Sequence, residues 1–308
     1  MRIGTRASDL ARTQAGTVAD ALIAVGLDCE LVPMTSDGDK TRASLASLGG
    51  TGVFAAGLRT ALLEGRCDAV VHSLKDLPTT PHPGLTVVAA PVREDPRDAL
   101  CARDGLTLTE LPHGARIGTG SPRRAAQLRT RRPDLDVVDI RGNVGTRLGF
   151  VTDGELDAVV LAAAGLHRLG LDHVVTEHLD LADWPTAPGQ GVLAVEIRTD
   201  TPPDSPLRGA LATIHDDAAW ACAQAERSVL ATLEAGCAAP VAAYADIRQD
   251  GGADILELHA VAYRPGGGDQ IEHRASGACV DGIDGAIALG AEAARYLLDA
   301  GASAWIHD

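Results

Sequence analysis

The 308-residue sequence predicts an α/β fold class, with two α/β domains around a cleft and a small C-terminal α+β domain. Three observations support this prediction. Residues 1–200 alternate strand-like and helix-like segments, which is typical of a largely parallel sheet. The pattern that opens with Arg2-Ile-Gly-Thr5 repeats from Arg116-Ile-Gly-Thr119. After the proline-rich residues 201–206, the pattern changes to a long helix, short alternating strands and a final helix.

The first region begins with a strand at residues 2–5 and a helix at residues 9–25. Leu10, Gln14, Val18 and Leu22 recur every four residues and so form one face of that helix, which ends at Gly26. We expect further strands at residues 30–35 and 68–72 and a helix at residues 53–64. The second region repeats this order, with strands at residues 116–119, 137–140 and 157–161.

Two crossings between these regions are expected, near residues 93–98 and 184–191. A strand at residues 192–197 follows the second crossing. The first domain is therefore predicted to be discontinuous. The predicted domains are residues 1–92 with 192–209, residues 97–186, and residues 214–308. In the third we expect helices at residues 216–234 and 282–300 and strands at residues 241–247, 255–263 and 270–276.

Composition excludes several classes of protein. The formal charge of −15 argues against binding to nucleic acid or to an anionic membrane. No apolar run approaches the roughly 18–20 residues of a membrane span, and no secretory signal is recognisable, so we expect a cytoplasmic protein. The six cysteines show no CxxC spacing and the histidines no HExxH motif, so we expect free thiols and no metal site.

Polar and cationic residues follow the expected strands at the points where the strands end. In open α/β sheets, ligands bind at the carboxyl ends of strands, where helix N-termini also favour anions. Ser121 suits a helix N-cap and Pro122 the first helical position, and two guanidinium groups follow in the first turn. Cations there oppose the helix dipole, so an anionic ligand explains them better than a solvated face. The residues concerned are Arg6, Ser8, Lys75, Thr119, Ser121, Arg123, Arg124, Arg141, Arg147 and Arg168.

Two further residues stand out from this cationic set. Asp76 is a carboxylate among cations, which suits a ligand that also has a positive or N–H-bearing part; the alternative is a surface pair with Lys75 or a cap before Pro78. Cys237 lies between glycine and alanines in an expected loop, whereas most free cysteines are buried in helices or strands. No P-loop or GxGxxG motif accompanies them.

The sequence resembles the porphobilinogen deaminase family, also called hydroxymethylbilane synthase, along nearly the whole chain. Each segment alone is a weak signal, but their order and spacing together are specific. The segments are residues 2–8 (RIGTRAS), 71–78 (VHSLKDLP), 93–98 (REDPRD), 118–124 (GTGSPRR), 140–147 (IRGNVGTR), 188–191 (PGQG) and 234–237 (EAGC).

The resemblance implies two periplasmic-binding-protein-like α/β domains and a transferase of tetrapyrrole and haem biosynthesis. Such an enzyme joins four porphobilinogen molecules head to tail with loss of ammonia and releases hydroxymethylbilane. The growing chain is held on a dipyrromethane cofactor, bound through a thioether that the resemblance assigns to Cys237. Porphobilinogen and the growing chain are then the partners, and a monomer is expected.

Residue roles also follow from the resemblance. Asp76 is expected to be catalytic, because a fixed carboxylate that accepts pyrrole N–H bonds would offset the positive charge that develops when ammonia leaves. The remaining cofactor contacts are assigned to Lys75, Asp76, Thr119, Ser121, Arg123 and Arg124. The substrate and chain carboxylates are assigned to Arg6, Ser8, Arg141, Arg147, Arg168 and Gln190.

The sequence departs from the family pattern in three places. Ser47 and Thr51 stand in a lid segment where many members carry lysines, Gly120 replaces the first of two serines, and Ala235 replaces a glycine. Two alternative functions explain less of the sequence. A non-catalytic anion-binding module would leave Asp76 and Cys237 without a role. A hydrolase with Cys237 as nucleophile would need a base, for which only His72 and His215 are candidates.

Overall fold

The computed structural model describes residues 1–34, 53–236, 238–278 and 282–306. These residues form two compact units, Met1–Glu94 with Gly191–Trp220 and Asp95–Gln190 with Ala221–Asp308. The predicted division into three domains stays a prediction, because the second unit groups the last two. The Ser47 and Thr51 departures lie outside the described residues.

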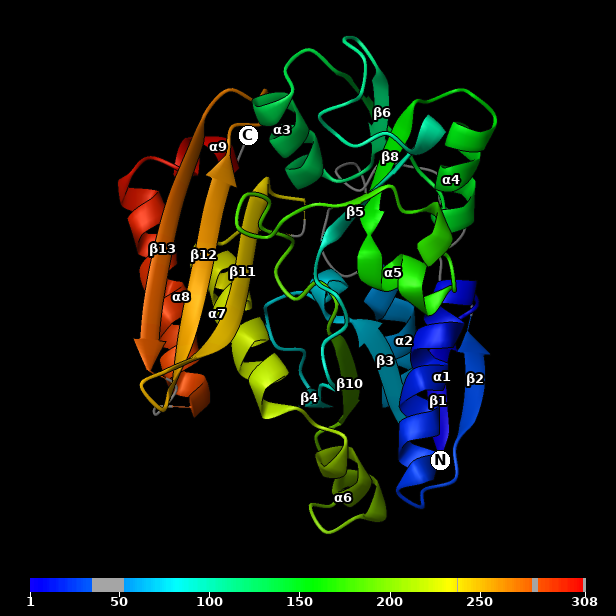
Figure 1. Cartoon of the computed structure of the whole chain (residues 1–308). Helices are drawn as coiled ribbons and strands as arrows, with labels where there is room; N and C mark the ends of the chain where they lie inside the picture. Colours follow the sequence, from blue (N-terminus) through cyan, green and yellow to red (C-terminus); the bar gives the residue numbers. More distant parts are fainter. Residues whose placement is uncertain (35–52, 237, 279–281, 307–308) are drawn as a thin grey trace. The chain divides into compact units, whose positions relative to one another are not determined.

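The first unit contains a five-stranded sheet of order β2-β1-β3-β10-β4 (Figure 1). Four strands run in one direction and β10 runs against its neighbours β3 and β4. The strands are β1 (Arg2–Arg6), β2 (Glu30–Met34), β3 (Ala69–Ser73), β4 (Leu85–Ala89) and β10 (Leu193–Arg198). The helices are α1 (Asp9–Ala24), α2 (Val53–Leu63), α6 (Pro206–Thr213) and the short 3-10 helix η2 (Leu74–Asp76).

The second unit contains another five-stranded sheet, of order β7-β6-β8-β5-β9. Strand β5 runs against its neighbours β8 and β9. The strands are β5 (Asp98–Ala102), β6 (Arg116–Thr119), β7 (Asp136–Asp139), β8 (Ala158–Ala162) and β9 (Glu177–His178). The helices are α3 (Pro122–Arg131), α4 (Val144–Thr152), α5 (Ala163–Arg168), η3 (Arg103–Gly105) and η4 (Asp172–Val174).

A repeated sequence explains the common strand order of these sheets. In both, a glycine of the first parallel strand packs where a side chain could not fit: a Cβ on Gly4 would lie 2.9 Å from Val70 Cγ1, and one on Gly118 would lie 2.6 Å from Leu156 Cδ1. Each sheet also fixes the register of its parallel strands with one aspartate. Asp68 accepts from the Arg2 backbone N–H at 2.8 Å, and Asp157 accepts from that of Arg116 at 2.7 Å.

The C-terminal part of the second unit is a three-stranded antiparallel sheet with helices packed on one face (Figure 1). A continuous apolar core joins the helices to that face, including Val229, Leu258 and Ala294. On the other face, Val261 and Tyr263 cluster with Ala126 of α3. The elements are α7 (Asp217–Thr232), β11 (Val241–Asp250), β12 (Ala253–Tyr263), β13 (Gln270–Ala278), α8 (Gly282–Asp299) and α9 (Ser303–Ile306).

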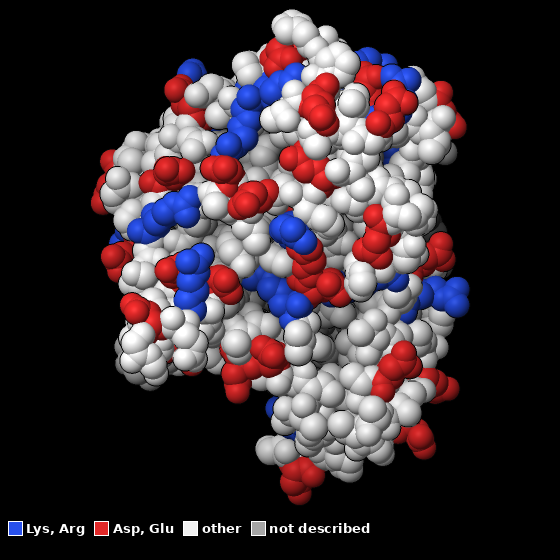
Figure 2. All heavy atoms as spheres, in the orientation of Figure 1, with Lys and Arg blue, Asp and Glu red and all other residues white. Residues whose placement is uncertain are grey.

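The predicted α/β class with a smaller α+β part is confirmed, and the expected strands and helices agree with the observed ones to within a few residues. Strands β4, β5 and β9 and helix α6 were not expected, so the reversed strand β5 of the second sheet was missed. Among the described residues, no helix is long and apolar enough to span a membrane. Basic and acidic side chains are interspersed on the face shown in Figure 2.

Candidate active site

In the first unit, the predicted site residues gather at the carboxyl ends of β1 and β3. Arg6 is the last residue of β1, and Ser8 caps α1 by accepting a hydrogen bond from Ala11 N at 3.4 Å. Lys75 and Asp76 form the helix η2 that follows β3. Because β1 and β3 are parallel neighbours, these residues share one edge of the sheet.

The segment that carries Asp76 is fixed by hydrogen bonds on both sides. Leu74 N donates to Val192 O at 2.9 Å, which ties η2 to the residue before β10. Gln14 Nε2 of α1 donates to Ser73 Oγ at 2.9 Å. Asp76 itself is exposed and Lys75 is half-buried. The candidate catalytic carboxylate therefore lies on a restrained turn with access to solvent.

A buried cluster of three polar side chains lies deeper in the same sheet. Glu196 of β10, 2% exposed, accepts from Arg59 Nη2 at 2.8 Å and pairs with His72 Nε2 at 3.2 Å. Burial alone would raise the pKa of Glu196, but hydrogen bonds from His72 and Arg59 lower it to about 2. Glu196 is thus a fixed, ionised carboxylate in the core. It forms an ion pair with Arg59 and lies on β10, beside β3, the strand that ends at Ser73.

In the second unit, helix α3 begins as the sequence predicts. Ser121 is the N-cap and Pro122 the first helical residue; Ser121 Oγ accepts from Arg124 N at 3.5 Å. Ser121 N donates to Oγ1 of Thr119, the last residue of β6, at 3.2 Å. This cap places Arg123 and Arg124 in the first turn of the helix, at the carboxyl end of β6.

The two arginines are buried, which the sequence did not indicate. Arg123 is 3% exposed and Arg124 is 6% exposed, and both bind Asp98, which is completely buried at the start of β5. Arg123 Nη1 donates to Asp98 Oδ2 at 2.8 Å, and Arg124 Nη2 donates to Oδ1 at 2.6 Å. The first-turn cations thus have an internal counter-ion in addition to any ligand.

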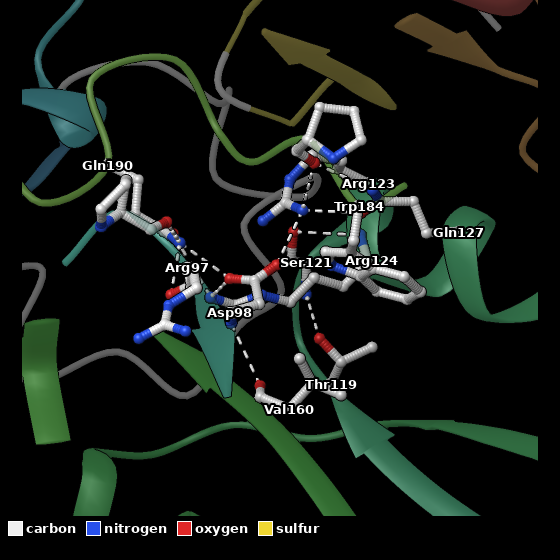
Figure 3. Close-up of polar contacts among 12 residues, drawn as sticks. Arg97, Asp98, Thr119, Ser121, Arg123, Arg124, Gln127, Val160, Trp184 and Gln190 are labelled. Carbon is white, nitrogen blue, oxygen red and sulfur yellow. Dashed lines mark hydrogen bonds and ion pairs between the residues drawn. The ribbon is translucent and has the colours of Figure 1, made fainter. Parts of the chain in front are cut away.

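Asp98 accepts four hydrogen bonds and lies at the centre of this cluster (Figure 3). Besides the two arginines, Trp184 Nε1 donates to Oδ2 at 2.9 Å and Gln190 Nε2 donates to Oδ1 at 2.8 Å. Burial alone would raise the pKa of Asp98, but the charges of Arg123 and Arg124 hold it well below its usual range. Asp98 is therefore ionised and satisfied.

The cluster nevertheless carries unsatisfied positive character. Two guanidinium groups surround one carboxylate, so these three side chains sum to one positive charge. Within the described residues, the buried Nε atoms of Arg123 and Arg124 have no hydrogen-bond partner. An unsatisfied buried donor costs about 1–3 kcal/mol, and more when it is charged. Burial lowers the pKa of Arg123, and the charge of Asp98 opposes that shift. The arrangement suits an acidic ligand.

The remaining predicted residues lie around the same sheet edge, apart from Arg168. Arg141 follows β7, and its Nη2 lies 3.5 Å from Asp139 Oδ1. Its buried Nε has no hydrogen-bond partner in the described part of the chain. Arg147 Nε of α4 donates to Gly142 O at 2.9 Å. Gln190 is brought directly to the arginine pair, since its Oε1 accepts from Arg124 Nη2 at 3.4 Å. Arg168 is the last residue of α5, one helix beyond the end of β8.

Gly120, one of the departures from the family pattern, has a structural reason. A Cβ at this position would lie 2.5 Å from the backbone oxygen of Ile140. The loop after β7 therefore approaches the loop after β6 too closely for a serine. Glycine in place of the family's serine therefore lets the loop that carries Ser121 pack closely against the loop that carries Arg141.

Cys237 lies outside the described residues, but the residues before it are described. Helix α7 ends with Glu234 N bound to Ala231 O at 3.2 Å and Ala235 N bound to Leu230 O at 3.0 Å. This is the pattern of a Schellman motif, in which the left-handed position is usually glycine. Here Glu234 occupies it with φ of 50°, so the chain just ahead of Cys237 has a defined and strained backbone.

Sequence reasoning missed four buried polar residues: Asp98, Gln127, Trp184 and Glu226. Gln127 Oε1 accepts from Arg123 Nη1 at 2.6 Å and its Nε2 donates to Pro185 O at 2.9 Å. Glu226 of α7 accepts from Gly189 N at 2.7 Å and from Ala245 N at 2.8 Å. The segment quoted for residues 93–98 contains Asp98, but nothing in it identified its partners.

Within the described residues, no group of three His, Cys, Asp or Glu side chains could hold a metal ion. Among the described cysteines, Cys29, Cys67 and Cys101 are free thiols. Burial raises the pKa of Cys101 to about 12, which makes this thiol a poor nucleophile.

The described residues form an α/β protein with two five-stranded sheets, a third antiparallel sheet and a buried arginine pair at the edge of the second sheet. Residues 1–203 match the family model described as "Porphobilinogen deaminase, dipyromethane cofactor binding domain", and residues 220–299 match "Porphobilinogen deaminase, C-terminal domain". The chain belongs to the porphobilinogen deaminase family. This confirms the predicted family and, with it, the expected activity and dipyrromethane cofactor.

Curated relatives agree with this assignment. The porphobilinogen deaminase of Leifsonia xyli is 58% identical over 273 residues, covering 88% of this chain and 82% of the relative. Porphobilinogen deaminase 1 of Streptomyces coelicolor is 50% identical over 309 residues, covering 98% and 96%. Among solved structures, the methionine binding protein MetQ aligns with a TM-score of 0.46 and 14% identity, covering 71% of this chain and 91% of that protein.

Proposed function

We propose that this chain condenses four porphobilinogen molecules with Asp76 as the catalytic carboxylate, while Arg123 and Arg124 bind the carboxylates of a dipyrromethane attached to Cys237. The observation that carries the binding role is the buried arginine pair with two unpartnered Nε–H groups and one excess positive charge. When bound, the dipyrromethane supplies the terminal pyrrole to which each new ring is joined.

The residues present fit this cofactor. Each of its rings carries an acetate and a propionate, and arginine binds carboxylates with two parallel hydrogen bonds. Thr119 and Ser121 lie next to the arginines at the cap of α3 and can donate hydroxyl hydrogen bonds. Lys75 and Asp76 supply a further cation and an acceptor for pyrrole N–H groups. Gly236 before Cys237 allows the backbone freedom that a covalent attachment point needs.

Asp76 has the properties that the chemical step needs. It is exposed on a turn fixed by Gln14 and Val192, so its carboxylate can meet a bound substrate without moving the backbone. Accepting pyrrole N–H bonds, it would stabilise positive charge on the ring as ammonia leaves. One preorganised group of this kind is worth about 2.7–4 kcal/mol.

The substrate and growing chain would be held by dispersed cations. We assign this role to Arg6 and Ser8 at the end of β1, to Arg141 and Arg147 beyond β7, and to Arg168 at the end of α5. Each added ring brings two more carboxylates, which suits separate arginines better than one compact phosphate-type site. Gln190, held against Asp98 and Arg124, would form a wall of the same site.

We also propose three domains, with boundaries near residues 92–97, 186–192 and 209–214, and a monomeric, cytoplasmic protein that binds neither nucleic acid nor membrane. The formal charge of −15 supports the absence of nucleic-acid and membrane binding, since a nucleic-acid or anionic-membrane site needs a basic patch.

Intact mass spectrometry of the purified protein tests this function. The wild-type chain should be heavier than its sequence mass by one dipyrromethane, and brief exposure to porphobilinogen should add a ladder of single-ring increments. Cys237→Ser should have the sequence mass and form no ladder. A wild-type protein that binds porphobilinogen reversibly without any covalent increment would instead indicate a non-catalytic binding module.

A further inference from the structure

We propose that Asp98 is a positioning residue that holds Arg123 and Arg124 in the orientation in which they bind the cofactor carboxylates. This inference rests on the proposed function. Asp98 does not itself need to touch the cofactor. It acts through the two guanidinium groups and sets both their direction and their combined charge.

The geometry gives Asp98 control over both side chains. Each of its oxygens binds one arginine, Oδ2 the Nη1 of Arg123 at 2.8 Å and Oδ1 the Nη2 of Arg124 at 2.6 Å. One Nη of each arginine is thereby used internally, and the two Nε–H groups remain unpartnered among the described side chains. Arg124 Nη1 also donates to Val160 O at 3.1 Å, so Asp98 and this carbonyl together decide which edge of Arg124 is left for a ligand.

The carboxylate is itself immobilised. Trp184 Nε1 and Gln190 Nε2 donate to its two oxygens, and Gln190 Nε2 also donates to Pro96 O at 2.8 Å (Figure 3). Gln127 adds a second restraint on Arg123 Nη1 at 2.6 Å. Long arginine side chains lose much conformational entropy when a ligand orders them. Here that ordering is already provided by the protein.

Stability alone does not account for this arrangement. Replacing a buried ion pair with apolar residues of similar volume is often neutral or stabilising, so a core position does not require charges. The location of Asp98 gives a better reason. It pairs in register with Ala162, the last residue of β8, at the edge where Thr119 and Ser121 also lie. Glu196 in the first sheet pairs with Val70, deeper in the strand.

Asp98→Asn and Glu196→Gln provide a matched pair of variants. Both remove one buried negative charge that is bound to arginine, and both are expected to lower the melting temperature. In Asp98→Asn the arginines lose the negative charge that they share, and an NH2 donor replaces one of the two acceptor oxygens. We expect the fraction of chains that carry dipyrromethane, measured by intact mass, to fall about tenfold or more. We expect Glu196→Gln to stay at the wild-type loading.

The measurements distinguish positioning from stability. Loading is measured well below each variant's melting temperature, before and after incubation with porphobilinogen. Wild-type loading in a folded Asp98→Asn would overturn the proposal, as would equal losses in both variants in proportion to their melting temperatures. A wild-type protein without dipyrromethane would instead reject the proposed function itself.

If Asp98→Asn does not fold, Trp184→Phe decides the question. This change removes the hydrogen bond to Oδ2 and keeps an aromatic ring in the core, with the loss of part of the indole volume. We expect a folded protein whose loading rate with porphobilinogen is reduced severalfold, because the carboxylate that holds Arg123 is less restrained. An unchanged loading rate in folded Trp184→Phe would overturn the proposal.

Discussion

The two five-stranded sheets have the same strand order and each contains one reversed strand with a buried carboxylate, but they use it differently. In the first sheet, Glu196 lies inside the strand and binds Arg59 and His72, and the polar residues at the sheet edge are separate from it. In the second, Asp98 lies at the edge and binds the arginines of the candidate site directly. One scaffold thus carries an exposed carboxylate on one sheet and buried cations on the other.

The comparison also extends to the residue after each repeated Arg-Ile-Gly-Thr segment. In the first sheet this residue is Arg6, a candidate ligand for substrate carboxylates. In the second it is Gly120, because the Ile140 carbonyl leaves no room for a side chain. The second sheet supplies its cations from helix α3 instead. The duplicated fold therefore sets where a site can form, while the neighbouring loops decide which residues fill it.

The largest effect on stability is expected from Glu196→Ala in the first sheet. The substitution leaves the Arg59 guanidinium buried without its partner, which costs about 3–5 kcal/mol of unfolding free energy. The double variant Arg59→Met with Glu196→Leu should recover part of that loss, since the Arg59 guanidinium is no longer left unpaired and only the His72 ring loses its partner. Urea unfolding measures both, and a double variant as unstable as the single one would contradict a purely electrostatic cost.

Asp76→Ala should have the largest effect on catalysis. We expect turnover to fall by roughly 100-fold or more, in line with about 2.7–4 kcal/mol of lost stabilisation, with little change in melting temperature because Asp76 is exposed. Asp136→Ala, an exposed carboxylate at the start of β7, is the control and should stay active. More than about a tenth of wild-type activity in Asp76→Ala would remove it from the mechanism.

Acid should weaken the first sheet through Glu196. Its pKa is about 2 in the fold against an ordinary value of 4.5, so the stabilisation is present above about pH 4.5 and is lost as the pH falls toward about 2. At about 1.4 kcal/mol per unit, this amounts to roughly 3 kcal/mol. Unfolding measured across this pH range should show a shallower decline for Glu196→Gln. Identical pH profiles for the two proteins would mean that other carboxylates, and not Glu196, cause the loss of stability in acid.

The smallest effect, on the order of 1–3 kcal/mol, is expected from Gly120→Ala, which forces the loops after β6 and β7 apart. Gly16→Ala in α1 is the matched control: no atom lies within 4 Å of its new Cβ, and helix propensity favours alanine by about 0.5–1 kcal/mol. Opposite shifts in melting temperature are expected. A neutral Gly120→Ala would show that the second sheet tolerates a side chain where the first carries Arg6.

Much of the fold and of the site could be predicted from local sequence. The cap at Ser121, the proline after it and the two arginines are consecutive, so their structure is set within one helical turn. The partner of those arginines could not be predicted in the same way. Asp98 is separated from Arg123 by 25 positions and meets it only because β5 enters the sheet beside β8. The charged, proline-containing segment that precedes β5 is typical of a crossing between domains, and it conceals the strand that follows.

Trp184 and Gln190 illustrate the same limit. They contact Asp98 across separations of 86 and 92 positions, which no periodicity or spacing reveals. Gln190 entered the predictions only through the family resemblance. The α/β class was easier, because alternation of strands and helices is a local pattern that persists over 200 residues.

The reversed strand β10 also has a consequence for how the chain is made. Residues 193–198 separate β3 from β4 in the first sheet, yet they are translated after the whole second sheet, whose last strand ends at His178. A ribosome therefore delivers every strand of the second sheet while β3 and β4 still lack their common neighbour. Folding during synthesis should finish the sheet that carries Arg123 and Arg124 before the sheet that carries Asp76.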